Sequence, residues 1–192
     1  YQITALSKLN SGIKRIVLVW HRRCGKDVTV FNWCVEQIIK NTITCYYIMP
    51  TYSQAKKVIW DGTTNDGQRI IEYIPEEFIA QKNQQEMKIR LKNGSLFQLV
   101  GSDNIDSLMG TNPHIVVFSE YSLQTPDAWD FIRPILKLNG GTAIFIYTPR
   151  GRNHAYDLYQ MATVQHDWWA QTLKYDDTNL LTREDIEKEI AE

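Results

Sequence analysis

The stretch that decides the fold is Ile16-Val17-Leu18-Val19-Trp20-His21-Arg22-Arg23-Cys24-Gly25-Lys26-Asp27. Its first five residues form an unbroken apolar run, which is typical of a strand buried on both faces. A helical pattern follows at once, because apolar residues recur on one face at Phe31, Val35, Ile38 and Ile39. The order strand, loop, helix predicts an α/β unit with its loop at the end of a buried strand.

The loop between that strand and helix has the residues that hold a phosphate. Gly25 lets the backbone close on the phosphates, backbone N–H groups cradle them, and Lys26 reaches the β- and γ-phosphates. The loop departs from the strict Walker A pattern, since Trp20 replaces the first glycine and Asp27 replaces the usual Ser or Thr. Taken alone, it is equally well explained as a basic loop at a helix start.

Further runs around this unit predict the fold class. Apolar strands are expected at 45–49, 115–118 and 143–147, with helical patterns between strands, so a mostly parallel sheet covered on both sides follows. Asn93-Gly94, between 88–92 and 95–100, predicts an antiparallel hairpin. The prolines, Pro134 among them, are expected at element edges.

The apolar run at 115–118 ends in Ser119-Glu120, the form of a Walker B strand. A carboxylate at that place can polarise an attacking water, although an acid after a strand is also an ordinary solvated residue. The combination of this strand with the Gly25-Lys26 loop, in the order expected of P-loop ATPases, favours nucleotide hydrolysis.

Composition limits the other classes of function. The chain has 192 residues, 43% of them apolar, and a formal net charge of -1, so one globular domain with no basic nucleic-acid-binding tail is expected. Its three cysteines form no C-x-x-C pair, which argues for a reducing compartment and against a zinc site. No apolar run approaches the length of a membrane span.

The loop 21–27 resembles the divergent Walker A loop of one branch of phage terminase large subunits. Further blocks resemble the same branch in the same order, at 50–56, 60–61, 101–104 and 148–154. The resemblance implies an additional-strand, RecA-like P-loop ATPase fold whose subunits form a homo-oligomeric ring and move DNA at the expense of ATP.

The resemblance also implies roles for individual residues. Gln2 would read the adenine edge, Arg22 would contact the γ-phosphate, and Glu120 would be the catalytic carboxylate together with Lys26. The remaining nucleotide-binding positions of the loop would be Arg23, Cys24, Gly25, Asp27 and Val28. A motif that couples hydrolysis to DNA movement would comprise Thr148, Pro149, Arg150 and Gly151.

The implied cofactors are ATP and Mg²⁺, and the implied partners are double-stranded DNA, the portal protein and the terminase small subunit. The expected location is the cytoplasm of the bacterial host, at the procapsid portal, with no membrane. Residues 1–175 would form the ATPase domain, and 176–192 would begin a linker or lid helix. Too few residues follow Asp177 to build the family's nuclease domain, which we expect to be absent from this chain.

Two positions depart from the family's pattern around the metal. Ser119 stands where a Walker B aspartate is usual, and Asp27 stands where the loop usually has a hydroxyl. One hypothesis is that the carboxylate has changed sides, so that Asp27, Ser119 and Glu120 together surround Mg²⁺. The other is that Ser119 is an unrelated loss that weakens metal binding.

Two rival functions stay open. One is a helicase or other translocase with the same core, and the other is a nucleotide-binding domain that does not hydrolyse its ligand.

Three arginines are candidates for a residue that acts across a subunit boundary, namely Arg133, Arg150 and Arg152; a solvated surface position is the alternative for each. Cys24 lies beside Lys26 before a helix N-terminus, which predicts a reactive thiolate.

Overall fold

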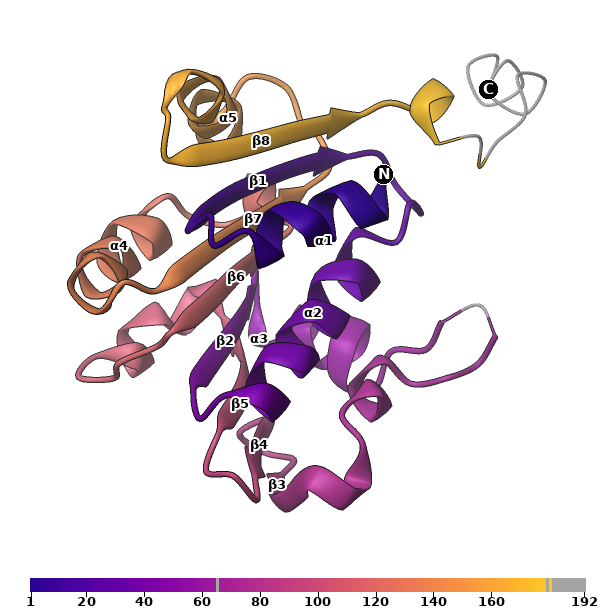
Figure 1. Ribbon diagram of the computed structural model, residues 1–192, viewed down its shortest axis with the longest axis vertical. Coiled ribbons are helices and arrows are strands. Elements are labelled where there is room, and N and C mark those ends of the chain that lie inside the picture. The colour runs from indigo at the N-terminus through magenta and orange to yellow at the C-terminus, as the bar shows by residue number, and fades with distance from the viewer. Residues whose placement is uncertain (65, 179, 181–192) are drawn as a thin grey trace.

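The computed structural model describes residues 1–64, 66–178 and 180, which are built around one eight-stranded sheet (Figure 1). Its order is β3-β4-β5-β2-β6-β7-β1-β8. The strands are β1 (Arg15–Trp20), β2 (Thr44–Met49), β3 (Ile79–Asn83), β4 (Lys88–Leu91), β5 (Leu96–Gly101), β6 (Ile115–Ser119), β7 (Thr142–Tyr147) and β8 (Trp168–Leu173). The four apolar runs predicted as strands are β1, β2, β6 and β7, so these predictions are confirmed.

The strand order confirms the expected fold class. Strands β5, β2, β6, β7, β1 and β8 pair in parallel, and β7 lies between the strand before the phosphate loop, β1, and the strand before Glu120, β6. This inserted strand is the arrangement of the additional-strand, RecA-like fold. The carboxyl ends of parallel strands share one edge, so the segments that follow β1, β6 and β7 are brought together there.

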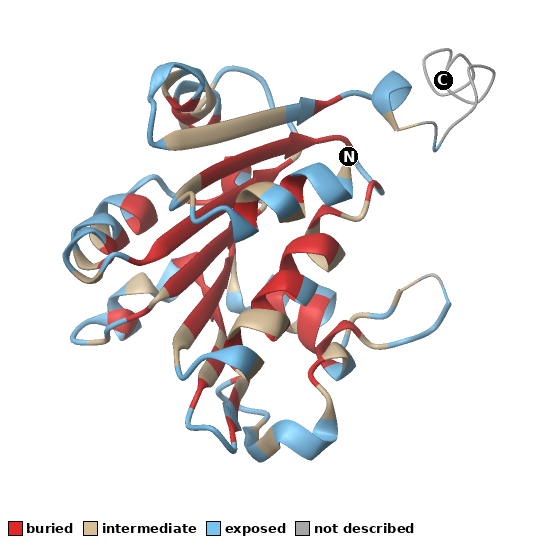
Figure 2. Ribbon diagram, viewed as in Figure 1, coloured by how far each residue is buried: buried red, intermediate tan, exposed pale blue. Residues whose placement is uncertain are grey.

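Helices cover both faces of the sheet (Figure 1). They are α1 (Gln2–Asn10), α2 (Lys26–Lys40), the short α3 (Tyr52–Ala55), α4 (Asp127–Asn139) and α5 (His154–Val164). Alternate residues of β1 enter different cores: Ile16 and Leu18 pack with α1 and α2, whereas Val17 and Val19 pack with α4 and α5. Strands β6 and β7 are therefore buried along their whole length, and β1 and β2 are buried except at their first residue, as Figure 2 shows.

Tryptophans contribute to these cores rather than to an exposed stacking surface. Trp20, Trp33, Trp60 and Trp129 are all buried. Trp168 is only half-buried, and it lies edge-on to Trp129 with ring centroids 6.2 Å apart.

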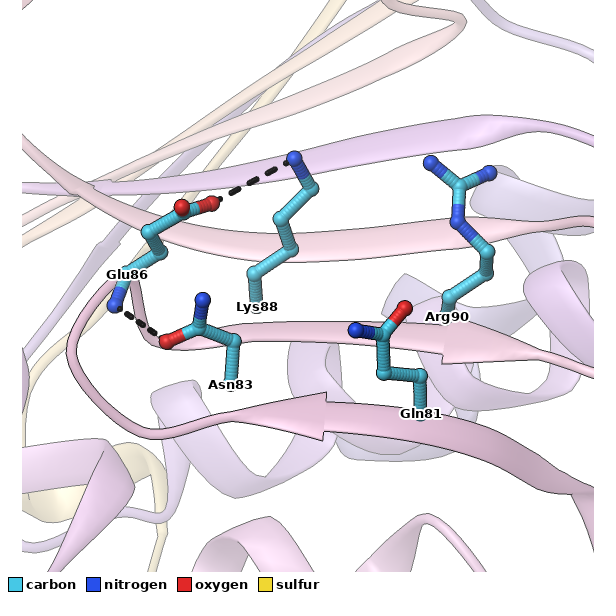
Figure 3. Close-up of a pocket in the computed structure, with 5 residues that line it drawn as sticks. All are labelled: Gln81, Asn83, Glu86, Lys88 and Arg90. Atoms are coloured by element: carbon cyan, nitrogen blue, oxygen red, sulfur yellow. Dashed lines mark hydrogen bonds and ion pairs between the residues drawn. The ribbon is translucent and has the colours of Figure 1, made fainter.

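The predicted hairpin is confirmed as β4 and β5, joined by a turn at Asn93-Gly94 in which Gly94 has φ +90°. Strand β3 extends it antiparallel at the sheet margin, far in strand order from β1. A small polar hollow lies over β3 and β4, lined by Gln81, Asn83, Glu86, Lys88 and Arg90 (Figure 3). Lys88 and Glu86 in it form an ion pair of 3.4 Å, so part of its charge is neutralised.

One expectation about element boundaries is wrong. Pro134 lies inside α4 rather than at an element edge. Proline in a helix removes the hydrogen bond to the carbonyl four residues earlier, here that of Asp130. Pro134 and Asp130 are both exposed residues, so this loss falls on the side of α4 that faces away from the core. Of the segment 176–192, where a linker or lid helix is expected, residues 179 and 181–192 lie outside the described residues. No helix in the described ranges combines the length and the hydropathy needed to cross a membrane.

Candidate functional site

The loop after β1 turns directly into α2. Gly25 caps the helix in the left-handed region, at φ 75° and ψ 24°, and α2 begins at Lys26. A Cβ on Gly25 would lie 2.9 Å from Nε2 of Gln2, so the position is restricted by both backbone conformation and space. Because α2 begins directly at the loop, the unpaired N–H groups of its first turn point towards the loop. Such N–H groups at a helix N-terminus bind anions.

The Lys26 ammonium brings three segments together. Its Nζ lies 3.2 Å from Oε1 of Glu120 and 3.2 Å from Oγ1 of Thr148. Lys26 is buried at 6% exposure, whereas the Glu120 side chain keeps 30%. The predicted binding, catalytic and coupling residues thus meet at one cation, although they are far apart in the sequence.

Glu120 has a backbone conformation that non-glycine residues rarely adopt, with φ 52° and ψ 43°. Such a conformation costs of order 1–3 kcal/mol and persists only where the surroundings impose it. Here the turn Tyr121–Leu123 follows, and the N–H of Leu123 donates to the Glu120 carbonyl at 2.9 Å. This turn directs the carboxylate from the end of β6 towards Lys26.

Asp27 and Ser119, the two departures from the family pattern, are in direct contact. The hydroxyl of fully buried Ser119 donates to Oδ1 of Asp27 at 2.5 Å, and the Tyr47 hydroxyl donates to the same oxygen at 2.9 Å. Burial, and then the neighbouring Asp27 charge, raise the pKa of Tyr47 well above its ordinary value, so the phenol stays a proton donor.

Sequence reasoning missed Tyr47, which it treated only as part of an apolar strand. The hydroxyl of a buried tyrosine normally finds a hydrogen-bond partner, and that requirement was the available sign that β2 contributes to the site.

These oxygens fit a magnesium ion that accompanies a nucleotide. No group of three or more His, Cys, Asp and Glu side chains suited to a metal exists in the described part of the chain. Magnesium at phosphate sites needs only one or two protein carboxylates, because substrate oxygens and water complete its shell. Asp27, with Ser119 against it and Glu120 next in the chain, supplies that kind of donor set.

The remaining loop residues divide into exposed and covered positions. Arg22 and Arg23 are exposed and have no ion pair within the described residues, so both guanidinium groups are free to contact a ligand. Gln2 lies against the loop, where its Nε2 donates to the Cys24 carbonyl at 3.4 Å. Val28 is half-buried in the first turn of α2.

The predicted thiolate at Cys24 is wrong. The side chain is fully buried, and its Sγ donates to the His21 carbonyl at 2.8 Å. Burial raises the pKa of Cys24, and the opposing effect of Lys26 does not outweigh it. The expectation of a lowered pKa rested on the neighbouring Lys26 in the sequence. It is wrong because the Cys24 thiol lies in the core, away from the open side of the loop.

The predicted coupling residues follow β7 and contact the turn after Glu120. Ser122 Oγ donates to the Thr148 carbonyl at 3.1 Å, and Asn153 Nδ2 donates to the Ser122 carbonyl at 3.1 Å. Pro149, Arg150 and Gly151 are exposed beyond Thr148. Sequence reasoning assigned no role to Ser122, or to Asn153 within the block 148–154, although these two residues tie the segments together.

The candidate arginines that would act across a subunit boundary are all exposed. Arg133 lies on α4, and Arg150 and Arg152 lie in the loop before α5. Arg152 lies over the Tyr156 ring at 5.8 Å.

Comparison with known proteins is consistent with this geometry. No family model matches the chain. The terminase large subunit of Escherichia phage T5 is 27% identical over 165 residues, a match that covers 82% of this chain and 36% of that protein. The chain therefore spans about a third of the length of that relative.

Solved structures have the same fold. A variant of the large terminase ATPase domain of Thermus phage P74-26 superposes with a TM-score of 0.78 at 20% identity, covering 99% of this chain and 85% of that one. The large terminase of a thermophilic bacteriophage, in complex with ATP-γ-S, gives 0.74 at 14% identity and covers 98% of this chain and 47% of that one. The resemblance to phage terminase large subunits is thereby confirmed.

Proposed function

We propose that this chain is the ATP-hydrolysing domain of a phage terminase large subunit and that it powers movement of double-stranded viral DNA into a procapsid. The observation that carries the proposal is the meeting of Glu120 and Thr148 at Lys26, because a phosphate loop, an acid and a coupling segment on one cation suit a nucleotide-driven motor. The likeness to terminase sequences and ATPase-domain structures supports it.

Each residue has a distinct task in this proposal. The N–H groups of the loop and of α2 bind the phosphates, and Lys26 and Arg22 neutralise the β- and γ-phosphate charge. Gln2 lies beside the loop and recognises the adenine base. Glu120 is the general base that orients and deprotonates the attacking water. Thr148 detects the change at Lys26 and passes it to the segment before α5.

Magnesium is the proposed companion of the nucleotide, where it neutralises charge on the phosphate oxygens. Asp27 is the carboxylate that serves it, with Ser119 and Glu120 alongside. The contact between Asp27 and Ser119 favours the hypothesis that the carboxylate has moved from the strand to the loop. The metal-binding charge is then retained although both motifs are altered.

The wider setting is proposed on the same basis. These domains would form a homo-oligomeric ring at the portal protein in the host cytoplasm, with double-stranded DNA and the terminase small subunit as further partners. Residues 1–175 form the motor domain, and 176–192 begin the linker to the rest of the protein. Arg150 or Arg133 would complete the neighbouring site, since both are exposed.

The test compares two variants at the site, measuring nucleotide binding and phosphate release on the assembled motor with DNA. Lys26→Ala is expected to abolish nucleotide binding, because Lys26 is the buried cation of the loop, and the exposed Arg22 and Arg23 do not occupy its position. Glu120→Gln is expected to keep binding and to lose hydrolysis by about 10²–10⁴-fold, since the amide cannot accept the proton.

Matched controls are Lys40→Ala and Glu36→Gln, which break an exposed ion pair at the far end of α2 and are expected to change neither property. Unchanged turnover in Glu120→Gln would remove Glu120 from the mechanism. Tight nucleotide binding with no phosphate release by the wild-type motor would favour the non-hydrolysing alternative. Hydrolysis that does not respond to double-stranded DNA but responds to single strands would favour a helicase.

A further inference from the structure

Tyr47 reaches the phosphate loop from the middle of the buried sheet. It lies on β2 with no exposed surface, and its ring packs against Phe31 of α2 and Phe97 of β5, with centroid separations of 6.0 and 6.5 Å. Aromatic neighbours on two elements restrict the ring, so its hydroxyl has a defined position. That position is 2.9 Å from Oδ1 of Asp27.

The two carboxylate oxygens of Asp27 have unequal surroundings. Oδ1 accepts hydrogen bonds from both Tyr47 and Ser119, whereas Oδ2 accepts none from any residue that the structure describes. Asp27 is half-buried, and Oδ2 is not among the fully buried polar atoms that lack a partner. Two donors on one oxygen fix the rotation of the carboxylate and leave the other oxygen open to a ligand.

We propose that Tyr47 is a positioning residue for the nucleotide's magnesium, since with Ser119 it orients Asp27 so that Oδ2 meets the ion directly or through one water. The proposal rests on the proposed function, because it needs a magnesium nucleotide at the loop. Tyr47 itself touches neither metal nor nucleotide. Residues that orient a metal-binding carboxylate in this way typically change metal affinity by about 10–100-fold when they are removed.

The experiment measures how strongly Mg²⁺ enhances the binding of a non-hydrolysable ATP analogue. Each protein is titrated with a fluorescent analogue in saturating Mg²⁺ and again in EDTA, and the ratio of the two dissociation constants is taken. Tyr47→Phe keeps the ring and removes only the donor, so it is expected to leave the EDTA value unchanged and to reduce the enhancement about 10-fold or more.

The matched control is Tyr46→Phe, the adjacent residue of the same strand, whose side chain packs in the core on the other face of the sheet. It is expected to match the wild type in both titrations. Mn²⁺ in place of Mg²⁺ gives a second readout, because the electron paramagnetic resonance spectrum of bound Mn²⁺ should change in Tyr47→Phe and stay unchanged in Tyr46→Phe.

The outcomes separate this inference from the proposed function. A wild-type chain that binds no nucleotide would refute the proposed function and with it this inference. Normal wild-type binding with an unaltered Mg²⁺ enhancement in Tyr47→Phe would refute the inference alone. An equal loss of affinity with and without Mg²⁺ would also refute it, since Tyr47 would then act only through the stability of the loop.

Discussion

Gly25 offers the sharpest test of the loop geometry, through the variant Gly25→Ala. The glycine has φ 75°, and an L-residue in this region costs about 1–2 kcal/mol. The new Cβ would also lie 2.9 Å from Gln2 Nε2 and displace an amide whose hydrogen bond to the Cys24 carbonyl is long, at 3.4 Å. The steric clash itself costs less than the backbone strain, because the Gln2 side chain can rotate away; any loss of the proposed contact between Gln2 and adenine adds to the backbone cost.

That cost should appear in nucleotide binding. Without ligand, the loop of the variant relaxes out of the left-handed conformation, and phosphate binding must restore it. A penalty of about 1–2 kcal/mol lowers affinity about 5–30-fold. The assay is a titration with a non-hydrolysable ATP analogue, with the thermal midpoint measured in parallel.

Gly12→Ala is the matched control, since Gly12 has φ +85° in an exposed turn and an added Cβ there meets nothing within 4 Å. It has the same backbone penalty at a place that contacts no part of the phosphate loop, so it should lower the thermal midpoint and leave affinity unchanged. Full affinity in Gly25→Ala, or equal losses of affinity in both variants, would refute the argument from loop conformation.

Two more predictions concern residues of the same site. Cys24 should react with alkylating reagents far more slowly than a free thiol at neutral pH, because burial covers Sγ and raises the pKa of the thiol. Mass spectrometry of the intact protein would detect the label, and rapid modification of the folded protein would contradict the buried thiol. Asp27→Ser should impair Mg²⁺-dependent ATP binding, and adding Ser119→Asp should restore much of the loss. In a double-mutant cycle the two positions should couple by roughly 0.5–3 kcal/mol. Purely additive effects would mean that the carboxylate has not changed sides.

Local pattern was sufficient for the elements that carry the site. The apolar run of β1, the Gly25-Lys26 loop and the periodicity of α2 are contiguous, so the residues themselves show the strand, the loop and the helix. The same holds for the hairpin at Asn93-Gly94, where the turn needs a positive φ that glycine readily adopts. These are interactions between near neighbours, and they are readable in a single chain.

Only the tertiary structure decided which groups each side chain contacts. Tyr47 reaches Asp27 because β2 lies in the sheet beneath α2, and nothing in the strand's own pattern says where its hydroxyl points. Cys24 turns inward although it adjoins Lys26, and Pro134 stays within α4 because its face is exposed. Packing between segments far apart in the sequence sets how deeply each side chain is buried and which groups it contacts. Burial and contacts in turn determine the pKa of a side chain and whether its backbone is strained. The sequence by itself therefore determined the loop and its acid, whereas the strand order alone brought Glu120 and Thr148 to Lys26.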